Sequence, residues 1–285
     1  MKDRIKNFIG FFGYPLFKIL KRKKGVSSII FHHIDRKYFS SFEKLIKLIQ
    51  NELGFIDPKD FASYTIDQYE INSKKVLLTF DDGFYSNYQL TKEILDPIDV
   101  KGLFFVNPNF AKLSKNSEYK TFMKDNFLFN NLNPNNSENI ENPEITPMKF
   151  NHMRELIDNG HTIGSHSYSH RRLSSLNSSK DLLYEILESK KILEEELLYK
   201  IKHFAFPFGD IKSISRESME IAKKHYEYIY SGIRGLNTVK LKKDIIFRES
   251  LNISNNTNYN LLLSANILSF KDRKSRYILN NLITK

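Results

Sequence analysis

The stretch "KVLLTFDDGFYSNYQLTKEILDPIDVKGLFFV", residues 75–106, indicates how this chain folds. It begins and ends with short apolar runs, residues 75–80 and 100–106, which are typical of buried strands. The segment between them, residues 87–95, has the composition of a helix. A strand, a helix and a second strand in this order predict a βαβ unit with parallel strands.

The same alternation extends to both sides of this unit. Strands are expected at 26–34, 161–166, 201–209, 226–232 and 244–253, and helices at 40–53, 150–160, 178–200, 215–225 and from about 259. This order predicts an α/β fold, a barrel of parallel strands with outer helices and with its chemistry at the strand carboxyl ends. We expect the barrel at 26–257 with an Asn-rich loop insertion at about 107–147, a basic and apolar segment at 1–25, and a C-terminal helical segment at 258–285.

Composition narrows the function classes. Of the 285 residues, 40% are apolar and 27% are charged, as in ordinary soluble globular proteins. The net charge of +11 is spread along the chain, and only residues 18–24 form a basic cluster, so we expect no nucleic-acid partner. The chain has no Cys, so a bound metal would need His, Asp or Glu ligands.

Residues 1–25 allow two interpretations. Their apolar run from 8 to 20 contains Pro15 and Lys18, is too short to span a bilayer and lacks a signal-peptide cleavage site. Either residues 8–24 make a peripheral contact with an anionic membrane, or the segment packs on the barrel. We therefore expect a cytoplasmic protein, either free or peripheral at the inner face of the membrane, rather than an exported one.

Two adjacent carboxylates, Asp81 and Asp82, follow the strand at 75–80. An Asp-Gly surface turn could carry both, which is the simplest interpretation of this site alone. However, the motif "SHSYSH", with His166 and His170, and the motif "FPFG" at 206–209 also follow expected strands. Because parallel strands of a barrel end at one face, we expect these polar groups to meet there.

The combination of His166, His170 and one carboxylate predicts a metal site. The two histidines are four residues apart, so on a helical turn they would face the same way, although an isolated pair is often a surface feature. Three such ligands leave coordination positions open, as in catalytic zinc sites. One aspartate would then bind the cation, and the other would remain free as a general base.

In this order and spacing, "TFDDG" (79–83), "HSYSH" (166–170) and "FAFPFG" (204–209) resemble the three motifs of the NodB-homology polysaccharide deacetylases. The resemblance covers roughly residues 26–250. It implies a distorted (β/α) barrel with fewer than eight regular units. The implied activity is metal-dependent removal of N-acetyl or formyl groups from amino sugars of a polysaccharide, an oligosaccharide or a lipid-linked glycan, with the cell-envelope glycans as the expected setting.

The resemblance also implies residue roles. Asp81 would be the general base. Three residues would hold the divalent metal, which we expect to be Zn²⁺, with Co²⁺ or Ni²⁺ as alternatives: Asp82, His166 and His170. The backbone N–H near Phe208, after Pro207, would stabilise the oxyanion.

Two departures from the family pattern need replacements. Ala205 stands where the family often has an Arg that orients the base; Arg248 is a candidate substitute, and a surface ion pair with Glu249 is the alternative. No His follows His225, so the usual late general acid is absent. In branches that resemble the exopolysaccharide deacetylases a first-strand His takes this role.

That match assigns the acid to His32 and makes His33 its neighbour. We interpret the four remaining histidines as structural or surface residues: His152, His161, His203 and His225. The same two departures leave a second function open, a sugar-binding pseudoenzyme that keeps the barrel without turnover. The complete Asp-Asp-His-His set argues against it, because a binding module needs no base beside a metal.

Overall fold

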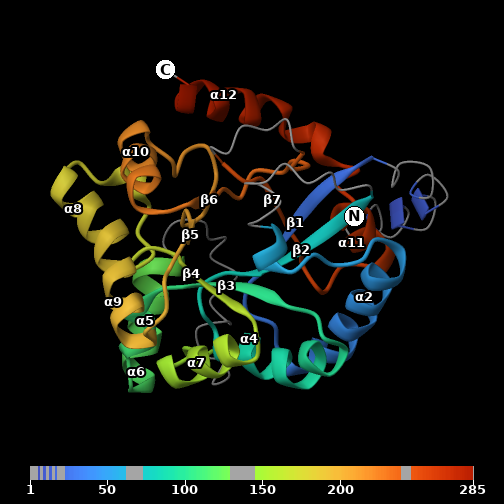
Figure 1. Ribbon diagram of the computed structural model, residues 1–285, viewed down its shortest axis with the longest axis horizontal. Helices are drawn as coiled ribbons and strands as arrows, with labels where there is room; N and C mark the ends of the chain where they lie inside the picture. The colour runs from blue at the N-terminus through green and yellow to red at the C-terminus, as the bar shows by residue number, and fades with distance from the viewer. Residues whose placement is uncertain are drawn as a thin grey trace.

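The computed structural model describes residues 6, 9, 10, 13, 14, 17, 23–61, 73–128, 145–238 and 245–284. Its centre is one seven-stranded sheet in the order β6-β5-β4-β3-β2-β1-β7, and all of its pairings are parallel (Figure 1). The strands are β1 (Gly25–Phe31), β2 (Lys74–Phe80), β3 (Gly102–Val106), β4 (Thr162–Ser165), β5 (His203–Ala205), β6 (Tyr228–Tyr230) and β7 (Arg248–Ser250).

The sheet curls into a nearly closed barrel. β1 pairs with β2 on one side and with β7 on the other. The remaining seam lies between β6 and the residues that precede β7, where Tyr230 and Ile246 form a parallel bridge. Ile246 N donates to Ile229 O at 2.7 Å, and Ser231 N donates to Ile246 O at 2.9 Å. The carboxyl ends of all seven strands therefore surround one opening.

Helices surround the strands, as Figure 1 shows for α2, α4, α7, α9, α10 and α11. The helices are α2 (Phe39–Glu52), α4 (Tyr85–Leu90), α5 (Pro108–Lys112), α6 (Asn116–Phe122), α7 (Phe150–Asp158), α8 (Ser179–Leu183), α9 (Ser189–Leu197), α10 (Arg216–His225), α11 (Thr257–Ser264) and α12 (Arg273–Thr284). Short helical segments add η1 (Arg36–Tyr38), η2 (Thr91–Leu95), η3 (Asp96–Ile98), η4 (Met123–Leu128), η6 (Leu173–Ser175), η7 (Tyr184–Glu188) and η8 (Ser269–Asp272).

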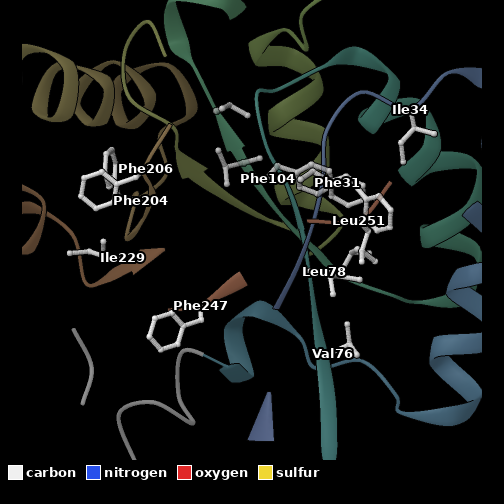
Figure 2. Packing of buried hydrophobic residues seen from close by; sticks show 14 of the residues in the cluster. Phe31, Ile34, Val76, Leu78, Phe104, Phe204, Phe206, Ile229, Phe247 and Leu251 are labelled. Carbon is white, nitrogen blue, oxygen red and sulfur yellow. The ribbon is translucent and has the colours of Figure 1, made fainter. Parts of the chain in front are cut away.

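Strand alternation divides the apolar side chains into two cores. One side of each strand faces the helices, and Figure 2 shows Phe31 and Phe104 close together there, with Phe204 and Phe206 as a second group. The other side fills the barrel with a smaller cluster: Val26, Phe61, Leu77, Leu103, Phe105, Ala205, Tyr228, Tyr230 and Ile246. Residues that continue the inward series past a strand end therefore point into the opening of the barrel.

Three expected elements differ from the sequence prediction. The helix expected at 178–200 is a helical run whose middle, η7, separates α8 from α9. The insertion expected as loop at about 107–147 contains α5, α6 and η4, while its Asn-rich part, 129–144, lies outside the described residues. The C-terminal helix is divided after α11, where Asn266 has a left-handed backbone with φ 57°.

The described residues of the N-terminal segment pack on the barrel domain. Phe17 is fully buried in the main core, and Tyr14 donates to Glu52 Oε1 of α2 at 3.0 Å. Lys6 Nζ donates to Asn255 Oδ1 at 2.8 Å, next to α11. In the part of the chain that the structure describes, every helix is too short or too polar to cross a bilayer.

Candidate active site

The two aspartates take different directions because the backbone turns between them. Asp81 N still donates to Phe31 O at 2.9 Å, which continues the β1–β2 ladder, so the Asp81 side chain keeps the inward direction of Leu77 and Thr79. Asp82 then has a left-handed backbone, with φ 74°, and Gly83 follows with φ 76°. This strained turn puts both buried carboxylates at the barrel opening.

His166 and His170 reach the same opening from a loop rather than from the helical turn that their spacing suggested. Ser167 and His170 have left-handed backbones, with φ 64° and 61°, and the loop is held by Asn107 Nδ2, which donates to Ser167 O at 3.1 Å. Nε2 of His166 lies 3.5 Å, and Nε2 of His170 3.2 Å, from Asp82 Oδ1. The four-residue spacing correctly predicted that the two imidazoles lie together, but the helical turn that it suggested is wrong.

This trio fits a divalent metal. Nδ1 of His166 lies 2.9 Å from Ala205 O and Nδ1 of His170 lies 3.1 Å from Asn126 O, so each Nδ1–H donates to a carbonyl and each Nε2 keeps its lone pair. Asp82 Oδ1 is buried and accepts no hydrogen bond. One potential ligand atom from each of the three residues lies within 4.8 Å of the others.

Burial and the surrounding charges set the protonation of these groups. Burial lowers the pKa of His166 to about 4, so its imidazole is neutral at pH 7, as a metal ligand requires. Burial raises the pKa of Asp82, but the neighbouring imidazoles, that of His170 first, together outweigh it and bring that pKa below the usual range. The site thus combines a neutral His166 imidazole with an ionised Asp82 carboxylate.

Arg248 on β7 holds Asp81. Its Nη1 donates to Asp81 Oδ1 at 2.7 Å and its Nη2 to Asp81 Oδ2 at 2.9 Å, which is a two-pronged pair. The guanidinium is buried, lies 4.9 Å from the Phe105 ring and donates through Nε to Ser231 O at 2.9 Å. The alternative of a surface ion pair with Glu249 is therefore wrong.

The pair keeps Asp81 ionised. Burial raises the pKa of Asp81, but the charge of Arg248, followed by that of His166, lowers it below its usual value. His166 Nε2 is 3.8 Å from Asp81 Oδ2, so the carboxylate lies directly beside the three potential metal ligands without belonging to the trio. This arrangement separates a carboxylate that is held by Arg248 from one that is available to a metal.

His32 and His33 diverge at the end of β1. His32 continues the inward series of Val26, Ser28 and Ile30 and lines the opening. His33 points the other way, with Nδ1 2.9 Å from Ser86 Oγ and Nε2 2.9 Å from Asp35 Oδ1. Strand alternation thus places the His32 imidazole in the site and directs the His33 imidazole towards Ser86 and Asp35.

The opening is a cavity of ≈ 290 Å³. It is lined by Ile30, His32, Asp81, Asp82, Phe127, His166, His170, Phe208, Gly232, Arg248 and Ser250. Phe208 follows Pro207 after β5 and has a left-handed backbone with φ 61°. Its ring lies 4.7 Å from that of His170 and 4.5 Å from the Arg172 guanidinium.

Four lining residues were not among the sequence candidates: Ile30, Phe127, Gly232 and Ser250. Ile30 could have been found, because it lies two residues before His32 on the same side of a strand. Phe127 had no usable signal, since its segment was expected to be an irregular loop. Gly232 and Ser250 lie in segments that reach the opening only once the barrel closes.

Comparisons with known proteins agree with this geometry. The family model of the polysaccharide deacetylases matches residues 68–227. A curated relative, the peptidoglycan-N-acetylglucosamine deacetylase of Bacillus cereus, is 29% identical over 140 residues, which are 49% of this chain and 38% of the relative. This match therefore spans well under half of that protein's length.

Solved structures share the fold at low sequence identity. The Streptococcus pyogenes deacetylase PplD, in complex with acetate, matches with a TM-score of 0.64 and 16% identity over 85% of this chain and 99% of its own. IcaB from Ammonifex degensii matches with a TM-score of 0.61 and 15% identity over 86% and 98%. The expected NodB-type barrel is confirmed. Because the family match extends over more than half of its residues, the chain belongs to the polysaccharide deacetylase family.

Proposed function

We propose that this protein is a metal-dependent amide hydrolase that removes the N-acyl group from an amino sugar of an envelope glycan. The observation that carries the proposal is the separation of the two aspartates. Asp81 is held by Arg248 and stays outside the trio, whereas Asp82 has an unsatisfied oxygen facing His166 and His170. A site that only bound sugar would need no free carboxylate beside a metal site.

Asp82, His166 and His170 would hold the cation, and Zn²⁺ suits two imidazoles and one carboxylate. When bound, the cation supplies Lewis-acid polarisation of the amide carbonyl. The protein's own contribution is an environment in which both imidazoles are oriented by backbone carbonyls before the metal arrives.

Asp81 would accept a proton from the attacking water, and Arg248 would keep the carboxylate ionised and correctly oriented. The Phe208 N–H, presented by the left-handed backbone after Pro207, would donate to the developing oxyanion. His32 would protonate the departing amine, since it reaches the cavity from the first strand.

We also propose that the acyl group is acetyl and that the glycan belongs to the cell envelope. The curated relative acts on N-acetylglucosamine of peptidoglycan according to its name, which supports an acetylated envelope glycan as substrate. The binding-protein alternative loses its main support. Arg248 contacts Asp81 although position 205 is Ala, and His32 lines the cavity although no late His exists.

Metal removal tests the proposal directly. We expect dialysis against a chelator to abolish release of acetate from N-acetylated glycan oligomers while leaving the circular dichroism spectrum unchanged, because the ligands sit at the ends of a large core. Adding back Zn²⁺, Co²⁺ or Ni²⁺ should restore turnover, and a formylated panel assayed in parallel identifies the acyl group. Full activity in metal-free protein would refute the mechanism.

The two adjacent histidines offer a matched test of the acid. His32→Ala should retain metal, lose turnover by roughly 10²-fold and lose the alkaline limb of the pH–rate profile, because the proton donor is gone. His33→Ala should keep turnover within about threefold and lose some stability, since it removes contacts to Ser86 and Asp35. A larger turnover loss in His33→Ala would reverse the assignment.

A further inference from the structure

The short segment η4 touches one of the potential metal ligands. Asn126 O accepts from His170 Nδ1 at 3.1 Å, and the Phe127 ring lies edge-on to the His170 ring with centroids 4.5 Å apart. Phe127 also lines the cavity. One turn of the insertion after β3 therefore supplies both the hydrogen-bond acceptor of a ligand and a wall of the cavity.

The other imidazole is held differently. His166 Nδ1 donates to Ala205 O, which is part of β5 and so is fixed by the sheet itself. The acceptor for His170 lies 44 residues away in sequence, in a segment outside the barrel wall. The two imidazoles thus depend on different kinds of element, a strand of the barrel and a short helical segment outside it.

The position of η4 is set by a small apolar cluster that is separate from the main core. Phe84, Phe110, Phe122, Met123 and Ile145 form this cluster, and Phe127 is half-buried against it. The ring of Phe127 lies 5.6 Å from those of Phe84 and Phe110 and 5.4 Å from that of Phe122. Because Phe127 bridges this cluster and His170, its packing determines where the Asn126 carbonyl sits.

We propose that η4 is a positioning element for the metal site and that Phe127 is its key residue. Docking of Phe127 on the small cluster places the Asn126 carbonyl, which fixes the tautomer and orientation of His170. Metal binding and docking of η4 are then thermodynamically coupled, so each stabilises the other. The inference rests on the proposed ligand set of Asp82, His166 and His170.

The decisive measurement is metal affinity rather than turnover. Phe127→Ala should weaken Zn²⁺ binding, measured by calorimetry against a competing chelator, by roughly 10-fold to 100-fold, the scale for loss of a ligand's supporting contact. It should also change the visible absorption spectrum of the Co²⁺-loaded protein. Phe127→Leu, which keeps an apolar side chain on the cluster, should recover most of the affinity.

Asn126→Ala is the matched control. It keeps the carbonyl that His170 uses and removes only the side-chain amide, which donates to Phe122 O at 3.1 Å. We expect its Zn²⁺ affinity to stay within about threefold of wild type. In the unaltered protein, Zn²⁺ should slow hydrogen exchange of the amides at 123–128, which tests the coupling without any substitution.

The outcomes separate the two ideas. Wild-type affinity and an unchanged Co²⁺ spectrum in Phe127→Ala would overturn the inference. Amide hydrogen exchange at 123–128 that is the same with and without Zn²⁺ would also overturn it. The proposed function would stand in both cases. If the wild-type protein binds no divalent metal, both fail together. Weakened binding in Phe127→Ala with recovery in Phe127→Leu and normal binding in Asn126→Ala supports the inference.

Discussion

Asp81 and Glu249 are both buried carboxylates that lie close to an arginine, on opposite faces of the barrel wall. Asp81 takes two hydrogen bonds from Arg248, at 2.7 and 2.9 Å. Glu249, the next residue after Arg248 on β7, faces outward. Arg234 Nε lies 2.9 Å from its Oε1, yet neither Glu249 oxygen has a hydrogen-bond partner of acceptable geometry among the described residues.

The two carboxylates consequently ionise in opposite directions. Burial raises the pKa of Asp81, but the charge and hydrogen bonds of Arg248, together with the neighbouring imidazoles, outweigh it and lower that pKa. At Glu249, burial raises the pKa to about 8; Arg234 opposes this, and the negative charge of Asp272 adds to it. Arg234 is also 37% exposed and shares its charge with Asp272 at 3.3 Å. A short distance to an arginine is thus not enough to lower the pKa of a buried carboxylate. Two aligned, buried hydrogen bonds distinguish Asp81 from Glu249.

The largest effect should come from Asp81→Asn. We expect turnover to fall by roughly 10²-fold or more, since the proposed base is lost while the geometry of its neighbours is kept. Zn²⁺ content should remain, whereas Asp82→Asn should lose metal. Glu249→Gln should leave turnover unchanged, which separates the two carboxylates by function. Equal loss of metal in Asp81→Asn and Asp82→Asn would show that the aspartates do not have distinct roles.

Arg248→Met should reduce both stability and turnover. Removing one partner of a buried ion pair typically costs about 3–5 kcal/mol of unfolding free energy, because Asp81 is left buried and unpaired. Without Arg248 the pKa of Asp81 should rise, so the acidic limb of the pH–rate profile should move to higher pH.

The stability loss in Arg248→Met should be largest at neutral pH. It should shrink as pH falls, first through the raised pKa of Asp81 in the variant and then through its pKa in the wild type, which lies below the ordinary 3.8. Chemical denaturation at several pH values and pH–rate profiles measure these effects. Unchanged limbs would mean that Arg248 serves packing alone.

Glu249→Gln should give the smallest effect on turnover, and its effect on stability should appear as a change in pH dependence. Because the folded pKa, about 8, lies above the ordinary 4.5, folding binds a proton at intermediate pH. Wild-type stability from this group is complete below pH 4.5 and is lost as pH rises towards 8. The amide stays neutral throughout, so the variant should gain on wild type by at most about 1.4 kcal/mol per pH unit in that window.

Thermal or denaturant unfolding at pH 5, 7 and 9 measures this gain. Asp272→Asn is a useful companion, because it removes the charge that raises the pKa of Glu249 and should narrow the window. A stability difference between wild type and Glu249→Gln that does not vary with pH would mean that Glu249 is ionised at all these pH values, like Asp81.

Much of the site was readable from the sequence. Apolar runs with polar ends predicted the parallel barrel, and period-2 alternation explains why His32 and not His33 reaches the cavity. Asp81, Asp82, His166 and His170 were grouped because their motifs follow expected strands and, in this order and spacing, resemble those of the deacetylase family. The conformation of the His166–His170 loop was not found, because four-residue spacing cannot distinguish a helical turn from a loop with left-handed residues.

By itself, then, the sequence determined the fold class and the members of the candidate site. The first follows from local periodicity, and the second from the position of polar motifs after strands and from their resemblance to those of a family. Only the tertiary structure decided which charge holds Asp81, since Arg248 is 167 residues away in sequence and meets it through closure of β7 on β1. The contact between Phe127 and His170 was likewise decided by the tertiary structure, because the two residues lie in segments far apart in the sequence. The free energy of a buried pair depends on relative orientation and desolvation, and three-dimensional packing sets both.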